Sequence, residues 1–136
     1  MFYVVKKSRI IIVFILVLTI SAALILSVIT KDKNISLCTD HLKALGYSPE
    51  KKPDNITEIT IPEGFGSVYE NYNAIQAEAG YDLTPLRGKT VFVYTFNLND
   101  DEFTLANIMI SEGEIKGGDI MNPSLSGKMI PLIPKK

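Results

Sequence analysis

Cys38 and His41 carry the most reactive side chains in this sequence, and each is the only residue of its type. They stand three positions apart, so their side chains can meet on one face of a helix. A zinc site takes about four ligands, and no second Cys or His completes one. The spacing therefore favours two structural residues of a helix over a metal site or a thiol nucleophile.

The other candidate groups are carboxylates. Residues 99–102 bunch three of them in one polar turn, but without the alternate-residue spacing of calcium loops, so we expect a solvated turn. Glu63, Asp82 and Asp119 are scattered, and no spacing pairs them as a general acid and a general base. The sequence thus contains no catalytic constellation, and it indicates no cofactor, no metal and no identifiable small-molecule ligand.

Two segments can present polar groups to a partner. In the connector 81–89, Asp82 can accept a hydrogen bond from the backbone two residues later, which specifies the turn. In Gly117-Gly118-Asp119, no lysine follows at the spacing of a phosphate loop, and glycines within a strand mark a bulge or a close backbone approach. We take Asp82, Arg87 and Asp119 as the candidate partner-binding residues.

A long apolar segment determines where these groups are displayed. Residues 10–30 contain no charged side chain, and about 20 apolar residues in a helix cross the hydrocarbon core of a bilayer. Lys6, Lys7 and Arg9 precede the segment, whereas 31–33 carries a net charge of only one. The positive-inside rule therefore places the N-terminus in the cytoplasm and the rest of the chain outside.

This pattern divides the chain into four parts: a cytoplasmic N-terminus (1–9), a transmembrane helix (10–30), a linker (31–36) and an extracytoplasmic domain (37–136). A cleaved signal peptide is the alternative, with a cleavage site near Ser21-Ala22-Ala23. The apolar run continues through Leu24-Ile25-Leu26, which favours an uncleaved signal-anchor. A lipid anchor on Cys38 is disfavoured because the cysteine lies eight residues beyond the apolar run.

The exported part is acidic. From Asp32 onward it holds 10 Lys and Arg against 15 Asp and Glu, a net charge of −5. Such a domain gains no electrostatic attraction to nucleic acid, so nucleic acid is not an expected partner. One cysteine cannot form a disulfide scaffold, and a single thiol suits an oxidising exterior.

The periodicity of the exported part predicts an α+β domain. Helical spacing covers 36–45 and 67–79, and Ser67 with Glu70 matches a capping box at the start of the second helix. Strands are expected at 56–61, 90–98, 103–110 and 115–120. The last three are joined by short turns, so they are antiparallel. The predicted order is α-β-α-β-β-β, with both helices on one face of the sheet.

Several motifs resemble a bacterial family catalogued as domain of unknown function 4830. They are Leu45-Gly46-Tyr47, Ile61-Pro62-Glu63, residues 68–76, residues 80–89 and Gly117-Gly118-Asp119-Ile120. The resemblance covers residues 37–130. It implies a small domain behind one N-terminal membrane segment in Firmicutes. After the Gly-Gly-Asp, this chain has Met121-Asn122-Pro123 where family members often carry a cysteine or serine. The family has no established activity, so no catalytic residue is carried over.

We therefore expect an uncharacterised single-pass membrane protein whose extracytoplasmic domain is non-catalytic and binds or regulates an envelope or membrane partner. One alternative is a cell-wall-directed hydrolase that uses Glu63, Asp82 or Asp119, which requires a cleft with two carboxyl groups about 5–9.5 Å apart. The other is a purely structural spacer domain, which requires no pocket. Oligomeric state and partner identity are not specified by the sequence.

Overall fold

The computed structural model describes the backbone of residues 2–124 and 126–136 and the side chains of 6–124 and 126–136. The described chain forms two compact units, one ending at Lys33 and one from Asn34 to Lys136. The elements are α1 (Phe2–Ala44), β1 (Asn55–Thr60), α2 (Ser67–Glu78), the 3-10 helix η1 (Thr84–Leu86), β2 (Thr90–Asn97), β3 (Leu105–Ser111), β4 (Glu114–Asn122) and β5 (Lys128–Pro131).

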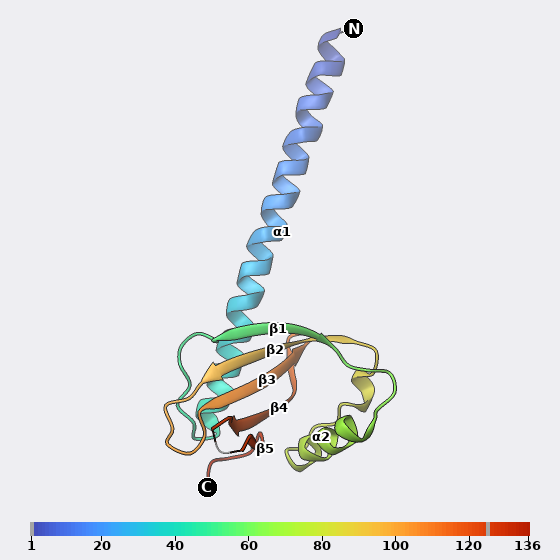
Figure 1. Cartoon of the computed structure of the whole chain (residues 1–136). Coiled ribbons are helices and arrows are strands. Elements are labelled where there is room, and N and C mark those ends of the chain that lie inside the picture. Colours follow the sequence, from blue (N-terminus) through green and yellow to red (C-terminus); the bar gives the residue numbers. More distant parts are fainter. Residues whose placement is uncertain (1, 125) are drawn as a thin grey trace. The chain divides into compact units, whose positions relative to one another are not determined.

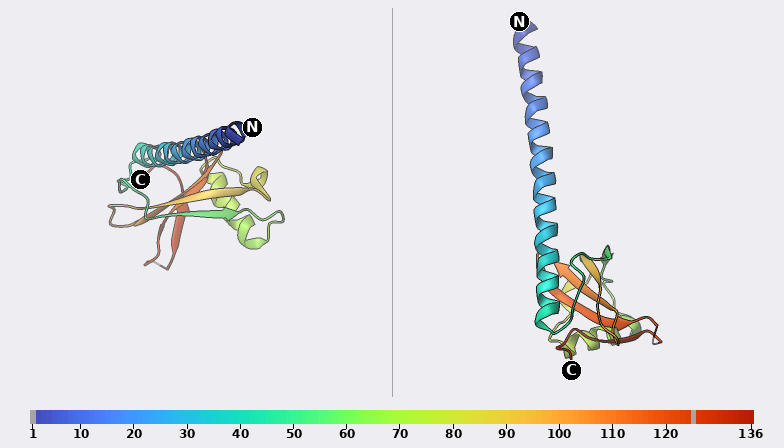
Figure 2. Two further views of the ribbon diagram at one scale, coloured as in Figure 1. Left: turned by 90° about the horizontal axis from the view of Figure 1, so that it is seen from above. Right: turned by 90° about the vertical axis from the view of Figure 1, so that its left-hand side faces the viewer.

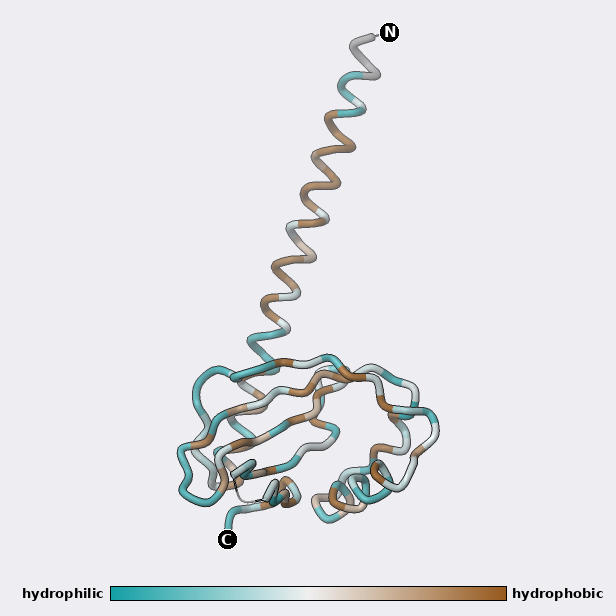
Figure 3. The backbone as a smooth tube through the Cα atoms, in the orientation of Figure 1, coloured by the Kyte–Doolittle hydropathy of each residue, from teal (hydrophilic) through white to brown (hydrophobic). Residues whose placement is uncertain are grey.

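Helix α1 contains the apolar segment (Figure 3). Its most apolar window has a mean hydropathy of 3.0, and no residue of that window is buried. By length and composition it can cross a membrane, a criterion that signal sequences also meet. The hydroxyls of Thr19, Ser21 and Thr30 donate to helix carbonyls three or four residues earlier, so the helix satisfies these three donors itself. Residues 31–36, expected as a linker, are helical throughout.

The second unit contains a five-stranded antiparallel sheet with the order β1-β2-β3-β4-β5 (Figure 1). This confirms the α+β class. The order of elements differs from the prediction by η1 and by β5, which the sequence analysis did not identify as a strand. The prolines argued against a strand because proline has no N–H to donate to a neighbouring strand. Pro131 is tolerated because it lies at the end of an edge strand.

Apolar side chains cover both faces of the sheet. On one face, Cys38 and Leu42 from the end of α1 pack in a cluster with Tyr94 of β2. On the other, Val91 and Met109 pack with residues of the connector and with Phe65, Tyr69 and Tyr72 of the α2 region. The prediction that both helices lie on one face is therefore wrong (Figure 2). β2 and β3 carry apolar residues on both sides, so alternation alone did not show which helix covers which face.

Helix α2 begins without the predicted capping box. Gly66 is the N-cap, in an extended conformation (φ −84°, ψ 178°), and no side chain caps the helix. The Glu70 N–H donates to the Gly66 carbonyl at 3.0 Å. Ser67 is thus the first residue inside the helix, one position too late for its hydroxyl to act as the cap.

Candidate functional site

The connector between α2 and β2 is held by a small polar network around Asp82. Oδ1 of Asp82 accepts hydrogen bonds from the Thr84 N–H (2.9 Å) and from Nδ2 of Asn73 (3.1 Å). Oδ1 of Asn73 accepts from the Leu83 N–H at 2.7 Å. The bonds from Thr84 and Asn73 lower the pKa of Asp82. The predicted turn at Asp82 is confirmed, and it fixes the connector while leaving the carboxylate exposed.

Arg87, at the end of the connector, lies over an aromatic side chain. Its guanidinium carbon is 4.5 Å from the centroid of the Phe65 ring, and the centroids of the Phe65 and Tyr69 rings are 5.4 Å apart. Val68 is 78% exposed between these aromatic residues in the sequence. We call Phe65, Val68, Tyr69 and Arg87 the connector surface. Tyr and Arg are enriched among the residues that dominate protein–protein binding energy, and a guanidinium above an aromatic ring makes a cation–π contact.

Sequence reasoning found only part of the connector surface. Arg87 was a candidate, whereas Phe65 and Val68 were not. Tyr69, Tyr72 and Gln76 are in fact the residues that turn toward the sheet. The signal that could have found Val68 is its angular position, about 100° from Tyr69 on a helix with a narrow buried face.

Asp119, the third candidate, lies inside the domain. It is 2% exposed, accepts a 2.8 Å hydrogen bond from the Tyr72 hydroxyl on Oδ2, and accepts a 3.0 Å bond from Nδ2 of Asn107 on Oδ1. Oδ1 of Asn107 accepts in turn from the Thr95 hydroxyl at 2.7 Å. Burial raises the pKa of Asp119, although the bonds from Asn107 and Tyr72 oppose this. Of the three candidate residues, only Asp82 and Arg87 are at the surface.

The two glycines before Asp119 allow α2 to approach β4 closely. The Gly118 N–H donates to Oε1 of Gln76 at 2.8 Å. A Cβ on Gly117 would lie 2.8 Å from that same oxygen, and a Cβ on Gly118 would lie 2.4 Å from the Asn107 carbonyl oxygen. The pairing of β3 with β4 also shifts register between Met109 and Ile110. The predicted bulge and close approach are confirmed.

Gln76 itself is fully buried on α2. Its Oε1 is used by Gly118, while its Nε2 makes no hydrogen bond among the described residues. Burial raises the pKa of Tyr72, one turn earlier, and the charge of Asp119 acts in the same direction. The hydroxyl of Tyr72 is therefore a neutral donor to Asp119 at any physiological pH.

Cys38 and His41 lie in the part of α1 that packs on the sheet. Cys38 is fully buried, and burial raises the pKa of its thiol to about 12. Burial lowers the pKa of His41, whose Nε2 has no hydrogen-bond partner among the described residues. A thiol with this pKa is a poor nucleophile and a poor metal ligand at neutral pH. Within the described residues, no three His, Cys, Asp or Glu side chains are grouped as metal ligands.

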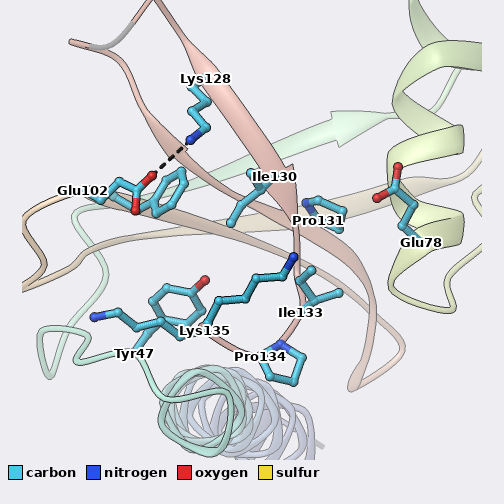
Figure 4. A pocket seen from close by; sticks show the side chains of 11 residues that line it. Tyr47, Glu78, Glu102, Lys128, Ile130, Pro131, Ile133, Pro134 and Lys135 are labelled. Carbon is cyan, nitrogen blue, oxygen red and sulfur yellow. Dashed lines mark hydrogen bonds and ion pairs between the residues drawn. The ribbon is translucent and has the colours of Figure 1, made fainter.

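A pocket of about 380 Å³ lies beside β5 (Figure 4). Its walls come from four separate parts of the chain: the residues after α1, the end of α2, the turn before β3, and the C-terminal segment 128–136. The lining residues are Tyr47, Glu78, Glu102, Phe103, Lys128, Ile130, Pro131, Ile133, Pro134, Lys135 and Lys136. Sequence reasoning missed this pocket because no single segment contains enough of it to form a motif.

Ion pairs hold two sides of the pocket. Lys128 binds Glu102 at 3.0 Å, and its ammonium lies 5.3 Å from the centroid of the Phe103 ring. Lys135 binds Asp100, whose side chain is only 4% exposed. The Lys135 N–H also donates to the Leu45 carbonyl at 2.8 Å. The C-terminal segment is therefore fastened across the domain by both the backbone and the side chain of one residue.

The structure does not gather the carboxylates considered for hydrolysis. Asp119 is buried under α2, whereas Asp82 and Glu63 are exposed. None of the three lines the pocket beside β5. The turn 99–102, expected to be solvated, contributes Asp100 to the interior and leaves Asp101 exposed.

Comparisons of the chain with protein-family models, curated protein sequences and solved structures find no match. The resemblance to domain of unknown function 4830 therefore stays a prediction. The class that the fold defines is an α+β domain, built on an antiparallel five-stranded sheet, in a chain with an apolar N-terminal helix long enough to cross a membrane.

Proposed function

We propose that this chain is a single-pass membrane protein that displays an extracytoplasmic domain to bind or regulate an envelope partner through the connector surface. The N-terminal helix supports the anchor, and the charge bias of its flanks supports an outward-facing domain. A bacterial envelope protein with an accessible acidic or aromatic patch fits the exposed chemistry of this surface.

The stacking of Arg87 on Phe65 is the observation that carries this proposal. A guanidinium held over a ring has already lost part of its conformational freedom, so a partner gains more from each hydrogen bond to it. Val68 is exposed to solvent, so a partner that covers it would bury additional apolar surface. The Asp82 network holds the connector in place, so the surface is preorganised for binding.

Site-specific photo-crosslinking in cells tests the proposal. A photoreactive amino acid is placed at Val68 in the full chain, and at Glu112 in the turn between β3 and β4 as the matched exposed control. We expect a discrete crosslinked product from position 68 that Arg87→Ala removes and that position 112 does not give. Identical products at both positions, or none from position 68, would overturn the contact surface.

Protease accessibility tests the orientation separately. Trypsin added to intact cells should cleave the domain and leave the N-terminal segment protected. Resistance in intact cells combined with cleavage after lysis would overturn the outward orientation.

A further inference from the structure

The pocket beside β5 is separate from the connector surface and has the size of a small-ligand site. Pockets of about 300–1,000 Å³ with mostly apolar walls and a few polar groups are typical of such sites. Here the aromatic rings of Tyr47 and Phe103 and the side chains of Ile130, Pro131 and Pro134 form the apolar walls. The body of a ligand in this pocket would thus be apolar.

The charges around the pocket specify the ends of the ligand. Lys128 is neutralised by Glu102, and Lys135 by the buried carboxylate of Asp100. Two charged lining residues then remain, Glu78 and Lys136, which make no ion pair among the described residues. One is an anion from α2 and the other a cation from the C-terminal segment, and Figure 4 shows Glu78 across the pocket from the Lys128–Glu102 pair. A ligand with both an ammonium and a carboxylate complements this pair.

The backbone of the pocket wall acts in the same direction. Pro131 and Pro134 have no N–H, and the N–H groups of Ile133 and Lys135 already donate to the Pro131 and Leu45 carbonyls, so this segment has few backbone donors left for a ligand. A ligand that supplies its own N–H groups fits such a wall better than one that only accepts. An apolar peptide combines N–H donors, an ammonium, a carboxylate and an aliphatic body.

We propose that this pocket binds short zwitterionic peptides with apolar side chains, oriented by Glu78 at the ammonium end and by Lys136 at the carboxylate end. The domain would then bind a soluble peptide in the pocket beside β5 and a protein partner at the connector surface. This proposal does not depend on the connector surface, because the two sets of residues do not overlap.

Calorimetric titration of the full chain in lipid nanodiscs with leucyl-leucine tests this proposal, and empty nanodiscs serve as the blank. We expect saturable binding that weakens at least about fivefold in Glu78→Gln and in Lys136→Met, the change expected for one lost charge contact of about 1 kcal/mol. Glu114→Gln, at an exposed carboxylate at the start of β4, is the matched control and should bind as the parent does.

The capped dipeptide N-acetyl-leucyl-leucine amide has the same apolar body without either charge. It should bind at least about fivefold more weakly than leucyl-leucine. Equal binding of the capped and uncapped dipeptides, unchanged binding in both pocket variants, or no saturable binding of leucyl-leucine at millimolar concentration would each overturn the proposal.

Discussion

The Tyr72 hydroxyl donates a 2.8 Å hydrogen bond to Oδ2 of Asp119, which joins α2 to the fourth strand of the sheet. Asn107 donates to the other carboxylate oxygen, and Thr95 fixes the orientation of the Asn107 amide. Both donors to Asp119 are neutral. The carboxylate is therefore buried with two hydrogen bonds but without a cation. The hydrogen bonds stabilise the folded state, whereas burial of the negative charge destabilises it.

Asp119→Asn should stabilise the domain at pH 7 by roughly 1 kcal/mol, the usual scale of a single substitution. The amide oxygen can accept from Asn107, and the amide N–H can donate to the Tyr72 oxygen, so the contacts remain while the buried charge is lost. Urea denaturation followed by circular dichroism measures the change. Asp119→Ala is the control, and it should destabilise by about 1–3 kcal/mol because two buried donors lose their acceptor.

The same substitution has a defined pH dependence. The pKa of Asp119 is raised in the folded state. Its protonated side chain therefore contributes to the free energy of unfolding in full below the usual pKa of 3.8, and this contribution is lost as the pH rises through the folded-state pKa. The advantage of Asp119→Asn should therefore be smallest well below pH 3.8 and should grow as the pH rises above that value. An advantage that is independent of pH would contradict the assignment to this charge.

Gly118→Ala should destabilise the domain by about 1–3 kcal/mol, as overpacking does. The new Cβ would lie 2.4 Å from a backbone oxygen of the neighbouring strand, and the glycine has a φ of +156°. Thermal unfolding compares it with Gly64→Ala, where a Cβ would meet no atom within 4 Å and little change is expected. Similar melting temperatures for both variants would be inconsistent with the close approach.

Cys38 should resist thiol reagents while the domain is folded. With a pKa of about 12, roughly one thiol in ten thousand is ionised at pH 8, and the side chain is fully buried. Labelling with Ellman's reagent should be slow in buffer and fast in urea above the unfolding midpoint. Rapid stoichiometric labelling in buffer would show that the end of α1 does not stay packed on the sheet.

Asp100→Asn should destabilise the domain at pH 7 by less than about 1 kcal/mol, because Lys135 is 46% exposed and solvent screens the pair. The hydrogen bond from Lys135 lowers the pKa of Asp100, so its contribution is present at neutral pH and is lost as pH falls through that lowered pKa. The two proteins should thus converge in urea midpoint as the pH falls well below 3.8. Lys135→Met should give the same loss at pH 7, and a double variant should lose no more than either single one.

Local sequence patterns predicted the elements well where one segment determines its own structure. The alternation in β2 and β3, the turn at Asp82 and the glycine bulge before Asp119 all depend on residues close together in the chain. Features that need distant residues were missed. The cover of both sheet faces, the burial of Asp119 by Tyr72 and the pocket beside β5 arise only when segments far apart meet, and no spacing encodes such meetings.

The start of α2 shows a finer limit. The Ser67–Glu70 spacing matches a capping box, but Gly66 occupies the cap, and Val68, the second residue of the helix, is exposed. Helix boundaries differ by a residue or two between otherwise similar patterns, and one residue rotates a helix by about 100°. Val68, one of the four residues of the connector surface, was missed because it lies that far around the helix from Tyr69.

The bond from the Lys135 N–H to the Leu45 carbonyl bears on biogenesis. A nascent chain cannot form this bond until Lys135 has left the ribosome, long after the apolar segment of α1 has emerged. The domain can therefore close at this contact only after all five strands have been synthesised. A variant that ends at Ile133 would keep all five strands and would lose this contact, so the domain would open between residue 45 and the segment after β5.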